Sequence, residues 1–366
     1  MATETMRIVH LTADYPPRPW SGIGRSVETV ATSLARRGHR VEVLVADDLA
    51  PRAVGIARGL QRPPPQRQAR DVTVHRLDRR RLPIDPRGVD WLHLHSLRLA
   101  PLALALRDRF GLRLAVTVHT SLQHEKPHCV AWCALQRRLL RSCDHLVLPS
   151  RHLAEEVAEL LGTDEVPWSH VPHGVPVPSI AVDANLLSES VSPLRSEGPL
   201  VFAGRPSHAK GGDLALAVLR RFAHRTGGAI VAGGIRARDD RDGVHHTGWL
   251  DRARLERLFA AASLVLVPSR YEPFGLVAAE AQAVGAPILA ADVGGLREVV
   301  ADGGGGLRLG DHDVDTWCHT VAALLDDPAR RARLARRGPR AMRRRFCPER
   351  AAKRLESQVY RREIAR

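Results

Sequence analysis

The stretch LVLVPSRYEPFGLVAAEAQAVGAPILA, residues 264–290, carries two apolar runs that flank a segment of helical composition. The first run ends at Pro268 and the second begins at Pro287, and β-prone residues fill much of both. A strand followed by a helix and a second strand is the repeating unit of a parallel sheet. This stretch therefore predicts an α/β protein.

The same alternation of apolar runs and amphipathic segments extends over the whole chain. We predict about six strands in each half, which is the content of two doubly wound parallel sheets. A Pro- and Ser-rich segment of weak periodicity, residues 176–198, separates the halves. The other predicted strands are Arg7–Thr12, Val41–Val45, Val72–Leu77, Trp91–His95, Leu114–His119, His145–Pro149, Leu200–Ala203, Ala229–Ala232, Val244–Thr247 and Gly306–Leu309.

These patterns suggest two domains. We expect an N-terminal domain over residues 1–180 and a C-terminal domain over 181–345, with a helix over about 346–366 that packs back on the N-terminal domain. Residues 51–70 are rich in Pro and Arg and predict a loop. The basic stretch from residue 326 onward has helical composition, and solvated helix faces explain its arginines better than contact with an anionic membrane does.

Composition excludes several classes of protein. The net charge is +15, but only three of the 55 basic residues are lysine, which indicates biased base composition rather than a nucleic-acid surface. Aromatic residues make up 4%, too few for the stacking platforms that bind single strands. No apolar run is long enough for a membrane helix, and no signal-peptide pattern opens the chain. With five cysteines expected as reduced thiols, we predict a cytoplasmic protein.

Two glycine-containing segments are candidates for phosphate binding. Near the N-terminus, Gly22 and Gly24 lie just ahead of a predicted helix, where free N–H groups favour an anion, although a plain turn is the alternative. In the second half, Gly204 and Arg205 follow a strand, and Lys210 precedes the next helix. Two cations beside several backbone N–H groups suit a diphosphate, and surface charges on a turn are the alternative.

Two carboxylates in the opening stretch are candidates for sugar binding. Glu272 follows a strand, and Glu280 lies one to two turns into the next helix. Gly275 between them allows the backbone to approach a ligand. Carboxylates accept hydrogen bonds from vicinal hydroxyls, which sugars and ribose both present. The alternative is a helix-terminal charge beside a solvated glutamate.

With these motifs, the sequence resembles the family 4 retaining glycosyltransferases of the GT-B fold. The resemblance extends over nearly the whole chain, from the glycine loop through TVHTS and VPHGV to AGR…KG and the E-x7-E motif. It implies two Rossmann-like domains that face each other across a cleft. It also implies transfer of a sugar from a nucleotide diphosphate sugar, bound mainly by the C-terminal domain, to an acceptor bound mainly by the N-terminal domain.

The resemblance assigns roles to individual residues. Arg205 and Lys210 correspond to the pair that neutralises the diphosphate, so that neither a metal nor another cofactor is required. Glu272 corresponds to the carboxylate on the donor sugar, and Glu280 to the ribose-binding carboxylate. His119 corresponds to the histidine that faces the reacting sugar. The remaining donor-binding positions are the backbone N–H groups of Phe274, Gly275 and Leu276, and the glycines Gly22, Gly24 and Gly204.

Departures from the family pattern and two misleading motifs remain. Pro172-His173-Gly174-Val175 stands where P-N-G-V is common, and the charged segment at 235–243 lies where the nucleotide base docks in the family. Asp240-Arg241-Asp242 spells a metal-site motif of another fold, in an expected exposed loop. The His and Cys residues at 119–133 lack zinc spacing, so we expect a core role for Cys129 and Cys133, one turn apart in a helix that also buries Val130.

The sequence therefore predicts a metal-independent hexosyl- or other glycosyltransferase of the cytoplasm. The preferred acceptor is a small polar molecule or specialised metabolite of the antibiotic type. Alternatives are a phosphatidylinositol or lipid-linked acceptor, a pseudo-glycosyltransferase or epimerase on the same scaffold, and a non-catalytic nucleotide-sugar-binding protein. We expect no nucleic-acid partner, and a membrane surface is a possible but not favoured partner.

Overall fold

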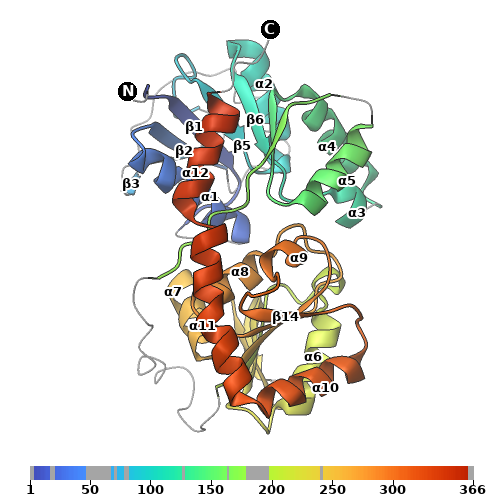
Figure 1. The fold of residues 1–366 in the computed structure, drawn as a ribbon. Helices are drawn as coiled ribbons and strands as arrows, with labels where there is room; N and C mark the ends of the chain where they lie inside the picture. The colour runs from blue at the N-terminus through green and yellow to red at the C-terminus, as the bar shows by residue number, and fades with distance from the viewer. Residues whose placement is uncertain are drawn as a thin grey trace. The chain divides into compact units, whose positions relative to one another are not determined.

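A computed structural model describes residues 4–16, 21–46, 67–69, 72–77, 82–125, 128–162, 165–178, 198–239 and 242–361. The chain divides into two compact units (Figure 1). Unit 1 comprises residues 1–174 and 348–366, and unit 2 comprises residues 175–347. The sequence-based boundary at 180/181 lies a few residues beyond this division. The chain thus passes between the units twice, and its last segment belongs with its first.

Unit 1 contains an eight-stranded sheet. All neighbouring strands are parallel except β3 and β4, which pair antiparallel. Within this sheet, His10 on β1 is directly paired with His93 on β5. In sheet order the strands are β3 (Arg67–Ala69), β4 (Val72–Arg76), β2 (Arg40–Val45), β1 (Arg7–Thr12), β5 (Trp91–Leu94), β6 (Arg113–Thr117), β7 (His145–Leu148) and β8 (Trp168–His170).

Helices cover both faces of this sheet. Alternate residues of each strand point to opposite faces, so Val9 and Leu11 contribute to one core and Ile8 to the other. The first face packs against α2 (Ala100–Phe110), α4 (Val130–Ser142) and α5 (Arg151–Leu161). The second face, which includes His10 and His93, packs against α1 (Gly22–Arg36) and α12 (Pro348–Leu355). A short helix, α3 (Leu122–Glu125), precedes α4.

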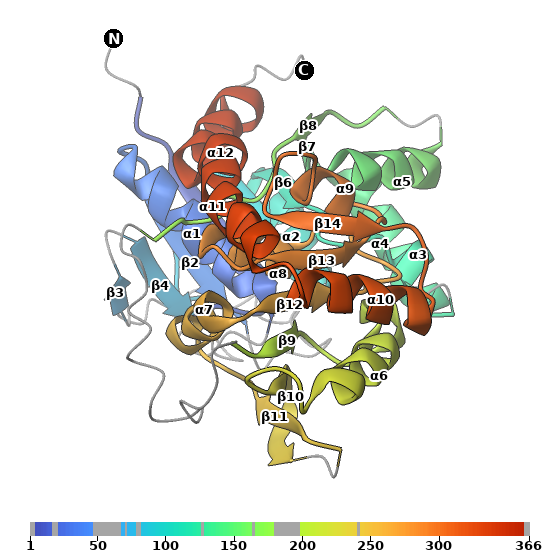
Figure 2. The same cartoon turned by 60° about the horizontal axis from the view of Figure 1, so that its bottom comes forward.

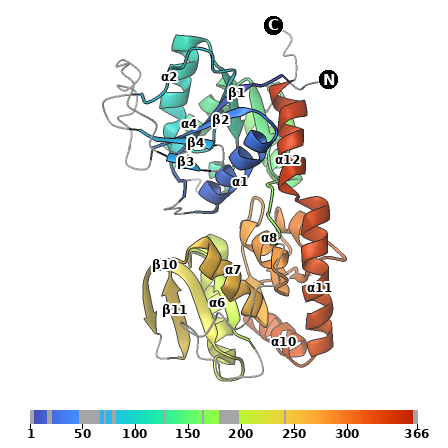
Figure 3. The same cartoon turned by 90° about the vertical axis from the view of Figure 1, so that its left-hand side faces the viewer.

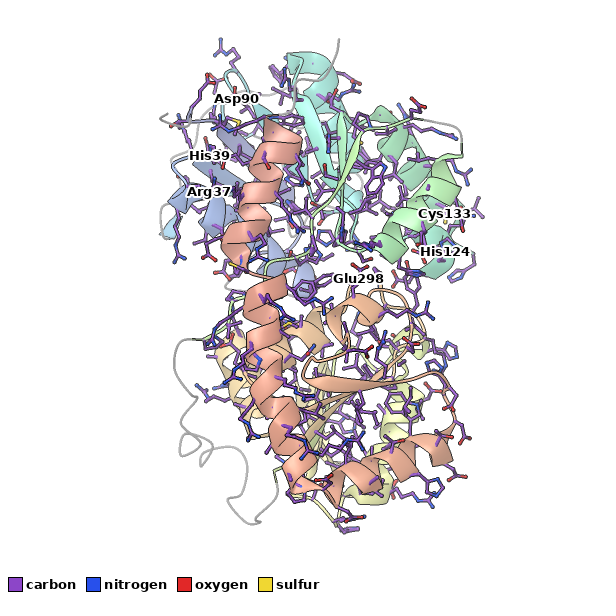
Figure 4. The ribbon with its side chains drawn as sticks, in the orientation of Figure 1. Arg37, His39, Asp90, His124, Cys133 and Glu298 are labelled. Atoms are coloured by element: carbon purple, nitrogen blue, oxygen red, sulfur yellow. The ribbon has the colours of Figure 1, made fainter. Side chains whose placement is uncertain are left out.

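The last described segment of the chain is tied firmly to unit 1. α12 lies beside α1 (Figures 1 and 3) and continues into a π-helical turn, Glu356–Tyr360. The buried Glu356 accepts hydrogen bonds from Arg37 and Arg361. Figure 4 shows Arg37 and His39 on the α12 side of the unit. The Trp91 indole N–H donates to the Tyr360 carbonyl at 3.0 Å, which joins the segment to the middle of the sheet.

Unit 2 contains a six-stranded parallel sheet, whose strand succession can be followed in Figure 2. One face packs against α7 (Arg252–Ala261), α8 (Leu276–Ala283) and the end of α11 (Pro328–Arg345), and Figure 3 shows α11 alongside α8. The other packs against α6 (Gly212–Phe222) and α10 (Val314–Leu325). α9 (Leu296–Val299) is short. In sheet order the strands are β11 (Val244–Gly248), β10 (Ala229–Asp239), β9 (Leu200–Ala203), β12 (Leu264–Val267), β13 (Ile288–Ala291) and β14 (Gly306–Leu309).

The predicted fold class is confirmed. All twelve predicted strands are present, and each begins within one or two residues of its predicted start. Two strands of unit 1 were not predicted: β8, and β3 inside the segment expected as a loop. Most of that segment lies outside the described residues, as do residues 179–197 of the expected interdomain connection. The charged segment after residue 234 was expected as a loop, but its first part continues β10 to Asp239. Among the described residues, no helix is long and apolar enough to cross a membrane.

The packing of α12 yields a test. Leu355 is buried in the core of unit 1, whereas Lys353, two residues earlier, is exposed. Leu355→Ala should lower the free energy of unfolding of unit 1 by about 2–5 kcal/mol, because a buried leucine leaves a cavity. Lys353→Ala should change it by less than about 0.5 kcal/mol. Urea unfolding followed by tryptophan fluorescence measures both, and equal effects would show that this helix is not part of the core.

Candidate active site

The most specific sequence motif forms a compact loop at the carboxyl end of β12. Glu272 lies in this loop, and its Oε2 accepts hydrogen bonds from Lys210 Nζ at 2.9 Å and from Ser269 Oγ at 3.2 Å. Lys210 comes from the loop after β9, the strand that pairs with β12. The fold therefore brings the predicted cation and the predicted sugar-binding carboxylate into direct contact, although 62 residues separate them.

Close backbone approaches hold these loops in place. Gly211 has a φ of +65°, and a Cβ there would come within 1.9 Å of the Pro268 carbonyl oxygen. Gly295 is equally confined, since a Cβ would lie 2.5 Å from the Cα of Phe274, and its N–H donates to the Glu272 carbonyl at 2.8 Å. Glycine at both positions therefore lets three segments meet around Glu272.

A second ion pair that sequence reasoning did not find supports the same loops. Arg270 donates to both carboxylate oxygens of Asp213, at 2.6 and 2.8 Å, and also to the His208 carbonyl. The Arg270 guanidinium holds the pKa of the Asp213 carboxyl at about 2. Asp213 opens α6, so the pair joins the start of α6 to the Glu272 loop. Nothing in the local spacing of the sequence could have indicated this pairing.

The other predicted donor-binding residues of unit 2 lie at the same end of the sheet. Gly204 follows β9 with a φ of +135°, and Arg205 is exposed. Gly275, with a φ of +105°, directly precedes α8, so the helix begins at Leu276. Phe274 is buried and packs edge-on against Phe346. Glu280 is half-buried on α8, two turns after Glu272 in sequence.

In unit 1, the predicted glycine loop is in fact the first turn of a helix. α1 begins at Gly22, and Ser21 caps it by accepting from the Ile23 N–H at 3.2 Å. Ser21 also donates to Asp14 at 2.6 Å. A Cβ on Gly24 would come within 2.9 Å of the Asp14 carbonyl oxygen, so the glycine allows close contact between α1 and the loop after β1.

His119 follows β6 in unit 1 and is half-buried among other histidines. Its Nε2 lies 3.4 Å from His95 Nδ1, and His95 Nε2 lies 2.9 Å from His10 Nδ1. Its ring stacks on that of His173, with centroids 5.1 Å apart and planes 12° apart. His173 Nδ1 in turn bonds Ser26 Oγ on α1 at 2.8 Å. The histidine that departs from P-N-G-V thus links α1 to the predicted catalytic histidine.

Sequence reasoning missed the buried histidines His10, His93, His95 and His173 as a group. His10, His93 and His95 are also the group of described residues whose ligand atoms lie close enough to hold a metal, within 4.8 Å of one another. The His93 ring stacks on the other two, with 4.4 Å between the centroids of His93 and His95, while the rings of His10 and His95 are tilted by 30°. His10 Nδ1 bonds His95 Nε2, and both ring nitrogens of His93 bond side-chain hydroxyls, so these nitrogens already have partners within the protein.

The suspected zinc residues of 119–133 have other partners. His124 bonds Ser121 at 2.9 Å and lies near Glu156, while His119 contacts His95 and His173. Figure 4 shows His124 and Cys133 in the α3–α4–α5 part of unit 1. The expectation that α4 buries Val130 is wrong, because this residue is 73% exposed at the exposed start of the helix. The core role expected of Cys129 and Cys133 is also wrong, because both are only half-buried. Of the Asp240-Arg241-Asp242 motif, only Asp242 is described, and it pairs with Arg220.

Burial favours the neutral form of His10, His93, His95, His119 and His173. It lowers the pKa of His10 to about 3 and that of His173 to about 4. It also lowers the pKa values of His93, His95 and His119 well below the usual range, and neighbouring histidines lower them further. Each of these residues takes up a proton more readily in the unfolded chain than in the folded one.

This difference predicts acid sensitivity. Because the folded-state pKa values are depressed, the neutral histidines stabilise unit 1 fully above about pH 6.5, and this stability is lost as the pH falls. Each buried histidine should remove about 1 kcal/mol per pH unit below that point. Urea unfolding of unit 1 from pH 7.5 to 5 should show this loss. His173→Asn should reduce the slope of the free energy of unfolding against pH by the contribution of about one proton taken up on unfolding. A constant free energy of unfolding over this range would contradict the prediction.

Two family models match the chain. The model "Glycosyl transferases group 1" matches residues 195–341, and the model "Glycosyltransferase Family 4" matches residues 20–177. The first match contains Glu272 and Lys210, and the second contains Gly22, Gly24 and His119. Together the matches include every predicted site residue.

Several glycosyltransferases resemble this chain in sequence or structure over most of its length. D-inositol 3-phosphate glycosyltransferase of Xylanimonas cellulosilytica is 35% identical over an alignment of 295 residues, which covers 72% of this chain and 70% of that protein. Glycogen synthase of Mycobacterium tuberculosis is 29% identical over 90% of this chain and 89% of that protein. The structure of HepE from Anabaena in complex with UDP and glucose has a TM-score of 0.75 at 17% identity, covering 98% of this chain and all of that one. The chain belongs to the family 4 glycosyltransferases and has their GT-B fold, with two Rossmann-like domains.

Proposed function

We propose that this glycosyltransferase moves a hexosyl group from a nucleotide diphosphate sugar to a hydroxyl of a small polar acceptor, with retention of configuration and without a metal. The observation that carries the proposal is the contact between Lys210 and Glu272 at 2.9 Å. In this proposal Lys210 serves the diphosphate and Glu272 the sugar hydroxyls, and glycine contacts hold their loops in place.

The chemistry of the two side chains is complementary. A nucleotide diphosphate is anionic, and negative charge builds up on it as the bond to the sugar breaks. Lys210 and the exposed Arg205 both follow β9 and supply positive charge there. In this proposal they stabilise the leaving group, so that the reaction proceeds in the presence of EDTA.

Neighbouring groups complete the donor site in this proposal. Glu272 accepts from hydroxyls of the donor sugar, and backbone N–H groups of Phe274, Gly275 and Leu276 lie in the same loop. Glu280, farther along α8, accepts from the ribose. The roles that the family resemblance gives to Gly24 and His119 of unit 1 stay predictions. The departing phosphate oxygen takes the acceptor's proton, which accounts for retention with no second carboxylate nucleophile.

The identity of the acceptor has less direct support than that of the donor. The named relatives act on D-inositol 3-phosphate or make glycogen, so a polyol phosphate is the first acceptor to test. The names give no support to a specialised metabolite of the antibiotic type, which stays a prediction from composition. Proton NMR of the product's anomeric position, from an α-linked donor, tests retention: an α-linked product is expected, and a β-linked one would contradict it.

Substitutions test the donor site. Glu272→Gln and Lys210→Ala should each lower kcat by about 100-fold or more, because each removes a preorganised contact with the sugar or its leaving group. Glu256→Gln, which breaks the surface pair with Arg252 on α7, is the matched control and should leave kcat unchanged. The measurement is the release of nucleotide diphosphate with and without acceptor, in the presence of excess EDTA.

Three outcomes separate the alternatives. Activity that survives both substitutions would overturn the site assignment. Nucleotide binding with no turnover on any acceptor would favour a non-catalytic protein on this scaffold. Conversion of the donor without a glycosidic product would favour an epimerase or pseudo-glycosyltransferase.

A further inference from the structure

Three histidines of unit 1 form a continuous hydrogen-bonded chain that ends at His119, the predicted catalytic histidine. We name His10, His95 and His119 the histidine relay. Its two contacts join His10 Nδ1 to His95 Nε2 at 2.9 Å and His95 Nδ1 to His119 Nε2 at 3.4 Å. His10 is on β1, His95 directly follows β5 and His119 follows β6, which are neighbouring strands of the sheet.

Each ring of the relay is neutral. His10 is fully buried and His95 nearly so, and burial depresses the pKa of all three residues. A neutral imidazole has one N–H donor and one acceptor nitrogen. Each contact in the relay joins two ring nitrogens, so one must donate and the other accept. Consequently the tautomer of one ring determines that of the next.

His10, the buried end of the relay, determines the direction of its hydrogen bonds. His10 Nε2 is buried and has no hydrogen-bond partner among the described residues. A buried N–H without a partner is rarer in proteins than an unsatisfied acceptor, because the donor loses its bond to water. His10 therefore carries its proton on Nδ1 and donates to His95. His95 then carries its proton on Nδ1 and donates to His119 Nε2, which leaves the proton of His119 on Nδ1.

Neighbouring groups hold the relay rings in orientation. His93 bonds Tyr360 Oη at 2.5 Å and Thr117 Oγ1 at 2.7 Å, and its ring stacks on His95. His173 stacks on His119. A cavity of about 30 Å³, large enough for one water, borders His93, His95 and His173. Rotation of the His95 ring would break its contacts with His93 and with the other relay rings, so these contacts favour the observed orientation of His95.

We propose that His10 and His95 are positioning residues that hold His119 in the tautomer with its proton on Nδ1. His119 then presents a donor, and not an acceptor, to an oxygen of the bound sugar. The role of His119 rests on the proposed function, whereas its tautomer is a property of the protein without substrate. The two can therefore be tested separately.

The direct test is the tautomer itself. In the full chain with ¹⁵N-labelled histidine at pH 7.5, the ring ¹⁵N shifts distinguish the two neutral forms, and loss of signals in His119→Gln identifies that residue. We expect His119 with a protonated Nδ1 in the unsubstituted protein and a mixture of tautomers in His95→Leu. His10→Leu should produce a mixture too, although His10 does not bond His119. The opposite tautomer, or one unchanged in both variants, would overturn the proposal.

Conservative variants distinguish a change of tautomer from the effects of misfolding. His95→Asn keeps an amide donor near the position of Nδ1, so it should retain the His119 tautomer that His95→Leu loses. His75→Asn is the control, since His75 is a buried histidine of β4 that bonds Glu42 outside the relay. If His95→Leu does not fold, the contrast between His10→Leu and His75→Asn decides. Stoichiometric zinc that His10→Leu removes would also overturn the proposal, because a metal would occupy the lone pairs that the relay uses.

Kinetics extend the test to catalysis. His95→Leu should lower kcat by about 10- to 100-fold, the effect typical of a group that orients a catalytic residue. The KM for the donor should change by less than about 3-fold, because the phosphate and sugar contacts of unit 2 remain. His95→Asn should restore most of kcat. If the protein proves inactive on every acceptor, the proposed function fails, while the NMR result still decides the relay.

Discussion

The parallel pairing of β9 with β12 is the constraint on which the candidate donor site depends. Both strands end at the same edge of the unit 2 sheet, so the loops that follow them adjoin. Gly211 then allows one loop to pass against the Pro268 carbonyl, at a distance that any Cβ would block. Only with this approach can Lys210 reach Glu272, and the Arg270–Asp213 pair holds the same loops from the other side. The site is thus a consequence of strand order and of glycine backbone contacts.

Unit 1 uses its sheet differently. The face covered by α1 and α12 carries a row of histidines among apolar side chains. Buried polar groups are tolerated where they bond one another, and here the bonds lead from the core to His119. The same face binds the end of the chain, through Tyr360 and the carboxylate of Glu356. Stability of this unit and orientation of its predicted catalytic histidine therefore rest on one set of contacts.

Much of the fold could be predicted from the sequence, because apolar runs of strand length alternate with capped amphipathic segments. β8 escaped prediction because its three residues, Trp168–His170, form no apolar run. The strand, turn and helix around the E-x7-E motif could be predicted because they lie within one short segment, and the motif indicated the candidate donor site. The histidine relay could not be predicted, because its bonded neighbours are 85 and 24 residues apart in sequence and only the pairing of β1 with β5 and of β5 with β6 brings them together.

The most direct test of the central claim, that unit 2 binds a nucleotide diphosphate sugar through the Glu272 loop, is a thermal-shift panel. UDP-, GDP-, ADP- and dTDP-glucose are each added to the full chain, with and without EDTA. A donor at about 100 times its Kd stabilises the protein by about 2.7 kcal/mol, which shifts the unfolding midpoint measurably. The account predicts an EDTA-insensitive shift with one of the four that Glu272→Gln weakens. A shift with none of them, or one that Glu272→Gln leaves unchanged, would contradict it.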